Sequence, residues 1–309
     1  MNNGITVLSL FDGISCGMIA LERADIPVNK YFAYEIDSYA IQISKKNYPQ
    51  IEHCGDVTTA DFTQYQGVDL LIGGSPCQDL CNMGSHKGLD GEKSSLFFEF
   101  VRALREAKPR FFLLENNASM TNKNKDIISS YMGVEPIFID SIDFSAQHRK
   151  RLYWTNIPFE QYESKRITIR DIAQSREEKN EYDITETVRK YLSSEYEGRK
   201  IQKTVSSKIR TLDGVSKCLG TYCGDYGNNT GLIIQYDDGR YFSITPIEAE
   251  RLQTLPDNYT EGVPPKKRFF GIGNGWTVDV ITHTHCKVLN LIYHKLVPLG
   301  LMPCWRCSV

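Results

Sequence analysis

The first half of the chain alternates short apolar runs with amphipathic stretches. The apolar runs are typical of buried strands, and the stretches between them, such as Asp37–Tyr48 and Ser94–Ala107, have helical periodicity. Strands that alternate with helices at this spacing predict βαβ units. We therefore expect an α/β fold with a mostly parallel sheet covered by helices on both faces. The predicted strands are Ile5–Phe11, Lys30–Ile36, Ile51–Cys54, Val68–Ile72, Arg110–Leu114, Pro136–Ile139 and Leu152–Ile157.

The pattern changes after about Pro158. Residues 159–240 are polar, rich in turns and only weakly periodic, which predicts a smaller region with a modest core. Helical signals return at Thr245–Leu252, where Thr245 is a good cap and Pro246 suits the first helical position. A last amphipathic helix is predicted over Thr277–Leu296. We therefore expect a large domain over 1–158, a small region over 159–240, a segment over 241–296 that returns to the large domain, and an irregular tail over 297–309.

Composition indicates a soluble globular protein, with 41% hydrophobic and 24% charged residues. The apolar runs are too short to span a bilayer and no secretory leader is evident, so we expect no membrane association. Nine irregularly spaced cysteines favour a reducing, cytoplasmic compartment over a disulfide framework. Cys304 and Cys307 have the spacing of a metal-binding pair, but without a second pair we expect no metal site.

The charge is unevenly distributed. The net charge is −2, but residues 147–210 carry 15 Lys and Arg against 10 Asp and Glu, which leaves −7 for the rest of the chain. Clustered positive charge is typical of a surface that binds a polyanion, although a solvated helix face would look the same. The densest basic stretch contains Arg199, Lys200, Lys203, Lys208 and Arg210 with no acid among them.

The first predicted strand leads into a turn with two glycines, Phe11-Asp12-Gly13-Ile14-Ser15-Cys16-Gly17. Glycines between a strand and a helix allow the backbone to approach a ligand, although ordinary turn chemistry also uses them. Glu35 lies near the end of the second strand and Asp56 follows the third, where acids can hold ribose hydroxyls and an adenine amino group. An adenosine site without a phosphate-binding fingerprint points to S-adenosylmethionine.

A thiol and a carboxyl follow two other predicted strands. Cys77 lies in Gly73-Gly74-Ser75-Pro76-Cys77-Gln78, and Glu115 follows Arg110–Leu114. A thiolate that adds to carbon 6 of cytosine would activate carbon 5 toward a methyl donor. A carboxyl at ring nitrogen 3 would favour that addition. Each residue alone has a plain structural explanation, as a buried small side chain or a surface acid, but their joint position at strand ends predicts an active site.

These residues belong to a set that resembles the DNA cytosine-5 methyltransferases over about residues 5–290. The matching pieces occur in the family's order. They are Phe11-Asp12-Gly13 with Gly17, Glu35, Asp56, Ser75-Pro76-Cys77-Gln78, Glu115-Asn116, Gln147-His148-Arg149-Lys150-Arg151 and Gly273-Asn274. Lys87-Gly88-Leu89, Leu96-Phe97-Phe98-Glu99-Phe100 and Gly275-Trp276-Thr277-Val278 look most like the animal de novo branch, whereas the length resembles a bacterial or phage enzyme.

The resemblance implies a Rossmann-like methyltransferase fold and a role for each matching residue. Cys77 would be the covalent nucleophile, Glu115 the partner of ring nitrogen 3, and Arg151 the ligand of the cytosine carbonyl, with Arg149 supporting the site. On the cofactor side, Phe11 would stack on adenine, Glu35 hold the ribose, and Asp56 the amino group. The remaining implied cofactor residues are Asp12, Gly13, Gly17, Ile36, Val57, Ser75, Asn274 and Trp276. Two positions depart from the family pattern: Asn117 replaces a usual valine, and Cys16 a frequent glycine.

The implied substrate is double-stranded DNA, from which the enzyme must extrude the cytosine. We expect the loop Gln78–Lys93 to close over the flipped base, with Gln78 and Ser85 contacting DNA, and residues 159–240 to recognise the target. We further expect a monomer in the cytoplasm of a prokaryote or of a phage-infected host. An RNA (tRNA) cytosine-5 methyltransferase, a non-catalytic DNA-binding relative and a nicotinamide-dependent oxidoreductase are the alternatives.

Overall fold

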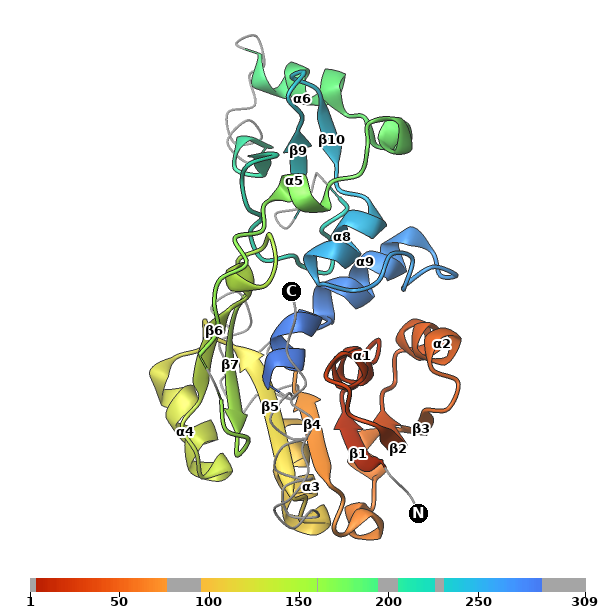
Figure 1. Ribbon diagram of the computed structural model, residues 1–309, viewed down its shortest axis with the longest axis vertical. Coiled ribbons are helices and arrows are strands. Elements are labelled where there is room, and N and C mark those ends of the chain that lie inside the picture. Colours follow the sequence, from red (N-terminus) through yellow and green to blue (C-terminus); the bar gives the residue numbers. More distant parts are fainter. Residues whose placement is uncertain (1–3, 77–95, 160, 194–204, 226–230, 285–309) are drawn as a thin grey trace, which may run out of the picture.

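The computed structural model describes residues 4–76, 96–159, 161–193, 205–225 and 231–284. Its largest element is a seven-stranded sheet of order β3-β2-β1-β4-β5-β7-β6 (Figure 1). Strands β1 to β5 pair in parallel, whereas β7 runs antiparallel to both of its neighbours, which confirms the predicted mostly parallel sheet. The strands are β1 (Ile5–Leu10), β2 (Val28–Tyr34), β3 (Glu52–Gly55), β4 (Leu70–Gly74), β5 (Phe111–Asn117), β6 (Ile137–Asp140) and β7 (Lys150–Thr155).

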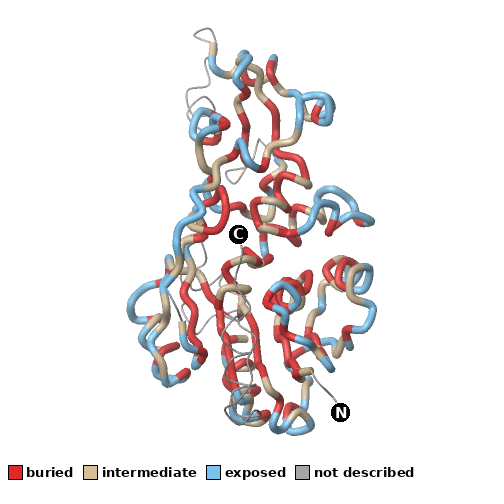
Figure 2. The backbone as a smooth tube through the Cα atoms, viewed as in Figure 1, coloured by how far each residue is buried: buried red, intermediate tan, exposed pale blue. Residues whose placement is uncertain are grey.

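Helices cover both faces of this sheet, so its central strands, which are mostly apolar, are buried at nearly every position (Figure 2). Alternate residues of a strand point to opposite faces, and the two apolar clusters divide accordingly. Leu70 and Leu113 pack with α1 (Cys16–Arg23) and α2 (Ser38–Asn47). Leu71 and Leu114 pack instead with α3 (Phe97–Ala107) and α4 (Asn122–Met132).

A second sheet of three short strands lies at the opposite end of the molecule from β1 (Figure 1). Strands β9 (Ile233–Gln235) and β10 (Tyr241–Ser243) form an antiparallel hairpin, and β8 (Ile209–Thr211) pairs with β9 in parallel. Gly239 closes the hairpin with a φ of +78°, a conformation that glycine adopts without strain. The other short elements are η1 (Val57–Thr59), η2 (Phe62–Tyr65), η5 (Ser141–Asp143), α5 (Ile169–Ile172), η6 (Glu177–Tyr182) and α6 (Thr185–Leu192).

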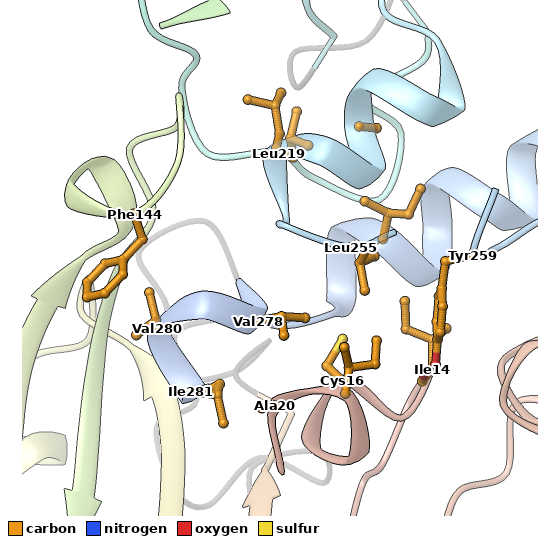
Figure 3. Close-up of a cluster of buried hydrophobic side chains, with 14 of the residues drawn as sticks. Ile14, Cys16, Ala20, Phe144, Leu219, Leu255, Tyr259, Val278, Val280 and Ile281 are labelled. Carbon is orange, nitrogen blue, oxygen red and sulfur yellow. Dashed lines mark hydrogen bonds between the residues drawn. The ribbon is translucent and has the colours of Figure 1, made fainter. Parts of the chain in front are cut away.

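The last part of the described chain returns to the first helix. Helix α8 (Pro246–Leu252) begins as predicted, with Thr245 as its cap and Glu248 completing a capping box. Helix α9 (Pro265–Asn274) follows, and residues 278–284 are helical again. Figure 3 shows Val278 and Ile281 packed beside Cys16 and Ala20 of α1. Within the described residues, no helix has the length and apolar character needed to cross a membrane.

Candidate active site

The carboxyl ends of β1, β4 and β5 meet at one edge of the large sheet. The chain runs from β1 outward to β2 and β3 on one side, and from β4 to β5 on the other. Such a reversal of strand order opens a crevice beyond the strand ends, where ligands of open α/β sheets bind. The turn after β1, the end of β4 and Glu115 of β5 therefore border one site.

Glu115 is the centre of this edge, and both of its carboxylate oxygens accept hydrogen bonds. Arg151 of β7 places its Nε 2.7 Å from Oε1, and the Trp276 indole Nε1 donates to Oε2 over 3.1 Å. The carboxylate side chain is only 12% exposed and that of Arg151 only 11%. A charge-assisted pair shielded from water is stronger than one on the surface.

Neighbouring groups fix the corner that precedes Cys77. Asn116 is buried, and its Nδ2 donates to the Ser75 carbonyl over 3.3 Å and to the Ser75 hydroxyl over 3.2 Å. Asn117 accepts the backbone N–H of Ser119, so the polar residue at this departure from the family pattern closes a turn. Cys77 itself lies outside the described residues, as do Gln78, Ser85 and the loop Gln78–Lys93.

The turn after β1 has the strained backbone of a binding loop. Phe11 has a φ of +57°, rare for a large side chain, and Gly13 has a φ of +58° with open space where a Cβ would lie. Glu35 holds this turn, because its carboxylate accepts the backbone N–H groups of Gly13, Ile36 and Asp37, each over 2.8 Å. Burial raises the pKa of Asp12, although hydrogen bonds from Ser15, Ser9 and Tyr31 oppose the shift.

The other predicted cofactor residues differ in their surroundings. Ile36 is 74% exposed, unusual for a large apolar side chain, and Asn274 is exposed at the end of α9. The exposed Asp56 caps η1 by accepting from Thr58, which lowers its pKa, and Val57 is buried behind it. Gly17 is explained by packing, because a Cβ there would lie 2.4 Å from Ile72 Cδ1.

A buried polar bridge joins the start of β7 to the returning C-terminal segment. Arg149 donates to the carbonyls of Leu219 (3.2 Å), Gly273 (3.2 Å) and Gly275 (2.8 Å). The side-chain amide of Gln147 donates to Gln253, whose amide oxygen accepts the Thr277 hydroxyl. Both Arg149 and Gln147 are buried, so Arg149 holds the segment that carries Trp276.

A profile of the C-5 cytosine-specific DNA methylases matches residues 5–290 of the chain. The chain belongs to this family. The type II methyltransferase M.NlaX of Neisseria lactamica is 27% identical over 296 residues, which are 89% of this chain and 93% of that protein. The orphan methyltransferase M.SPRI of Bacillus phage SPR is 32% identical over 161 residues, which are 48% of this chain and 37% of that protein. The predicted enzyme class, a cytosine-5 methyltransferase, is therefore confirmed.

Solved structures agree on the fold of this methylase. The Dnmt2 methyltransferase of S. pombe superposes with a TM-score of 0.71 at 20% identity, covering 93% of this chain and 99% of that one. The Entamoeba histolytica methyltransferase EhMeth gives a TM-score of 0.75 at 17% identity, covering 94% and 99%. At these identities the likeness establishes the Rossmann-like methyltransferase fold.

Sequence reasoning missed one thiol at the active site of this methylase. Arg149 and Arg151 donate to the Cys218 Sγ over 3.4 and 3.9 Å, and the residue is exposed. Desolvation by the surrounding protein raises the pKa of this thiol, but the charges of the two arginines have the larger effect, so the pKa is lowered. Cys218 lies in a polar stretch far from any motif, so no local pattern could reveal this contact.

The structure places only part of the methylase's predicted DNA-binding set. Arg199, Lys200 and Lys203 lie outside the described residues. Arg210 is partly exposed on β8, where it donates to the carbonyls of Ser207 and Ile209.

Lys208 is only 4% exposed, and burial lowers its pKa. A buried ammonium is a poor phosphate contact, so we do not expect Lys208 to bind DNA. Exposed arginines in the same region form ion pairs with acids, Arg170 with Asp213 and Asp237, and Arg176 with Asp238.

Proposed function

We propose that this methylase transfers a methyl group from S-adenosylmethionine to carbon 5 of cytosine in duplex DNA. The observation that carries the proposal is the shielded Glu115–Arg151 pair, which lies at the same sheet edge as the corner before Cys77. The thiolate of Cys77 adds to carbon 6 of the ring, and a proton shared between Glu115 and ring nitrogen 3 stabilises the electron pair that the addition moves onto the ring. Arg151 holds the carboxylate in place and binds the ring carbonyl. After methyl transfer to carbon 5, the carbon 5 proton passes to a base in the solvent, and its bonding electrons re-form the ring double bond as the thiolate leaves carbon 6.

The turn after β1 fits an adenosine ligand. The open space at Gly13 lets a ligand approach the backbone, and Phe11 and the exposed Ile36 supply apolar surface for a planar base. Glu35 and Asp56 supply acceptors for ribose hydroxyls and an amino group. When bound, the cofactor supplies an electrophilic methyl group on its sulfonium. Asn274, Trp276 and the buried Ser75 complete the pocket wall.

Duplex DNA is the substrate we favour because the curated relatives are named type II and orphan methyltransferases and the chain has a basic central segment. The ring atoms of a stacked cytosine are hidden, so the base must leave the helix, at roughly a few kcal/mol of unstacking. Residues 159–240, which include β8 and β9, would recognise the target. The basic residues Arg199, Lys200, Lys203 and Arg210 would contact phosphates, which adds affinity and salt dependence.

The deciding experiment traps the covalent step. The purified chain is incubated with S-adenosylmethionine and duplex DNA that contains 5-fluorocytosine, and the adduct is located by peptide mass spectrometry. Methyl incorporation into unmodified duplex DNA and into tRNA is measured alongside. We expect an adduct at Cys77 and methyl transfer to DNA, both lost in Cys77→Ser. Transfer to tRNA alone would contradict the DNA substrate, and an adduct at another residue would contradict the assignment of the nucleophile.

A further inference from the structure

One contact of Glu115 comes from the segment assigned to the cofactor pocket. The Trp276 indole Nε1 donates to Oε2 of the carboxylate over 3.1 Å, while the far edge of the same indole lies against α1. A Cβ on Gly17 of that helix would lie 3.6 Å from Trp276 Cζ3. The indole therefore spans the distance between the cofactor-side helix and the carboxylate.

The backbone at the end of β4 leaves room for this contact. A Cβ on Gly74 would lie 2.8 Å from Glu115 Oε2 and 3.0 Å from Trp276 Nε1, so any side chain at that position would wedge between donor and acceptor. Gly74 is also the cross-strand partner of Glu115 in the β4–β5 ladder. The absence of a side chain at Gly74 is thus what allows the indole to reach the carboxylate.

Trp276 is itself held on both sides. Arg149 donates to the carbonyl of the preceding Gly275 over 2.8 Å, and the hydroxyl of the following Thr277 donates to Gln253 over 2.8 Å. Gln253 is buried, as are Gly275 and Thr277. These bonds hold the chain on either side of Trp276, so the indole extends toward Glu115 from a fixed backbone.

We propose that Trp276 is a positioning residue for Glu115, in addition to any contact with the cofactor. This inference rests on the proposed role of Glu115. A carboxylate has about four lone-pair directions, and Arg151 and Trp276 occupy one on each oxygen. Among the described residues these two donors fix the plane of the carboxylate, and the remaining direction on either oxygen can hold the proton that Glu115 shares with ring nitrogen 3. The C-terminal segment thereby orients the catalytic acid directly.

The test separates turnover from cofactor binding. In Trp276→Phe the ring remains but the N–H is lost, so we expect kcat to fall roughly 10- to 100-fold, the range for one hydrogen bond to a charged group. The KM for S-adenosylmethionine should stay within about threefold, because the aromatic wall is retained. As a matched control, Trp154→Phe removes the indole N–H that donates to Ser129 over 3.0 Å in the core, and it should leave kcat unchanged.

A second variant uses the same contact from the opposite side. Gly74→Ala should displace the indole and lower kcat, and combining it with Trp276→Phe should cost little more than either change alone, because both remove one contact. Additive losses, or a raised KM with an unchanged kcat in Trp276→Phe, would overturn the positioning role.

A third variant, Glu115→Gln, distinguishes failure of the positioning role of Trp276 from failure of the proposed function. If Glu115→Gln is nearly inactive while Trp276→Phe keeps its kcat, only the positioning role is wrong. If Glu115→Gln turns over normally, the proposed role of Glu115 fails and the positioning role fails with it.

Discussion

Replacing Arg149 with methionine should lower the stability of the folded protein. A residue that only contacts substrate would not have this effect. The guanidinium is buried and donates to the carbonyls of Leu219, Gly273 and Gly275. Gly275 keeps a second donor, the Gln253 amide at 3.3 Å. The carbonyl of Leu219 keeps the weaker Cys218 thiol donor at 3.6 Å, whereas that of Gly273 loses its guanidinium donor inside the protein, at about 1–3 kcal/mol.

Together with the lost bonds to a charged donor, we expect Arg149→Met to lower the free energy of unfolding by about 3–5 kcal/mol. That is a large fraction of the roughly 5–15 kcal/mol typical of a domain. The assay is urea unfolding followed by circular dichroism. Lys150→Met is the matched control, since Lys150 is the exposed next residue and the first of β7, and its loss should change stability by about 0.5 kcal/mol or less.

An Arg149→Met protein within about 1 kcal/mol of the wild type would refute this reasoning. It would mean that the segment carrying Trp276 is held by other contacts, such as the Thr277–Gln253 bond. A stable variant that nevertheless lost turnover would leave Arg149 with the role that the sequence resemblance implies, which is to support the catalytic site.

Three further predictions follow from buried or charged groups. Lys179→Met should lower the free energy of unfolding by about 3–5 kcal/mol, because it leaves the charge of Glu248 buried without the ion pair at 2.8 Å that now neutralises it. An unchanged melting temperature would contradict this prediction. Burial, and to a lesser extent the charge of Lys45, lowers the pKa of His53 in the folded protein. Between about pH 7 and about pH 5 the unfolded state therefore binds a proton first, and the free energy of unfolding should fall more in the wild type than in His53→Asn. Parallel curves of unfolding free energy against pH for the two proteins would exclude the effect. Iodoacetamide should modify Cys218 before Cys16 and Cys223, whose pKa values burial raises to about 12; peptide mass spectrometry reports the order, and faster labelling of Cys16 would refute it.

Much of the large domain could be predicted because its strands are apolar on both faces. The run around Leu71 is an example, where adjacent residues serve opposite faces and no polar residue interrupts. Strand ends were less predictable. Glu115 was expected after its strand, but β5 continues to Asn117 because Asn116 and Asn117 pair with Leu152 and Arg151 of β7. Such pairing depends on a strand distant in the sequence, which no local pattern reports.

The small sheet was not predicted, since its strands are three residues long and gain their stability from tertiary contacts. The site shows the same limit. Glu115 and Arg151 were placed by motif, and the structure brings them into contact. The buried carbonyls that surround Arg149 and the thiol of Cys218 come from segments without a motif, so their positions could only be read from the folded chain.

The contact between Trp276 and Glu115 also has a consequence for biosynthesis. About 160 residues separate these two partners along the sequence. At roughly 5–20 residues per second, a ribosome needs on the order of 10–30 s to travel from one codon to the other. During that interval the nascent polypeptide contains Glu115 but not the indole of Trp276 that orients it, so an unfinished chain should have little methyltransferase activity. The same separation suggests that two fragments, divided within residues 159–240, would regain activity only when mixed.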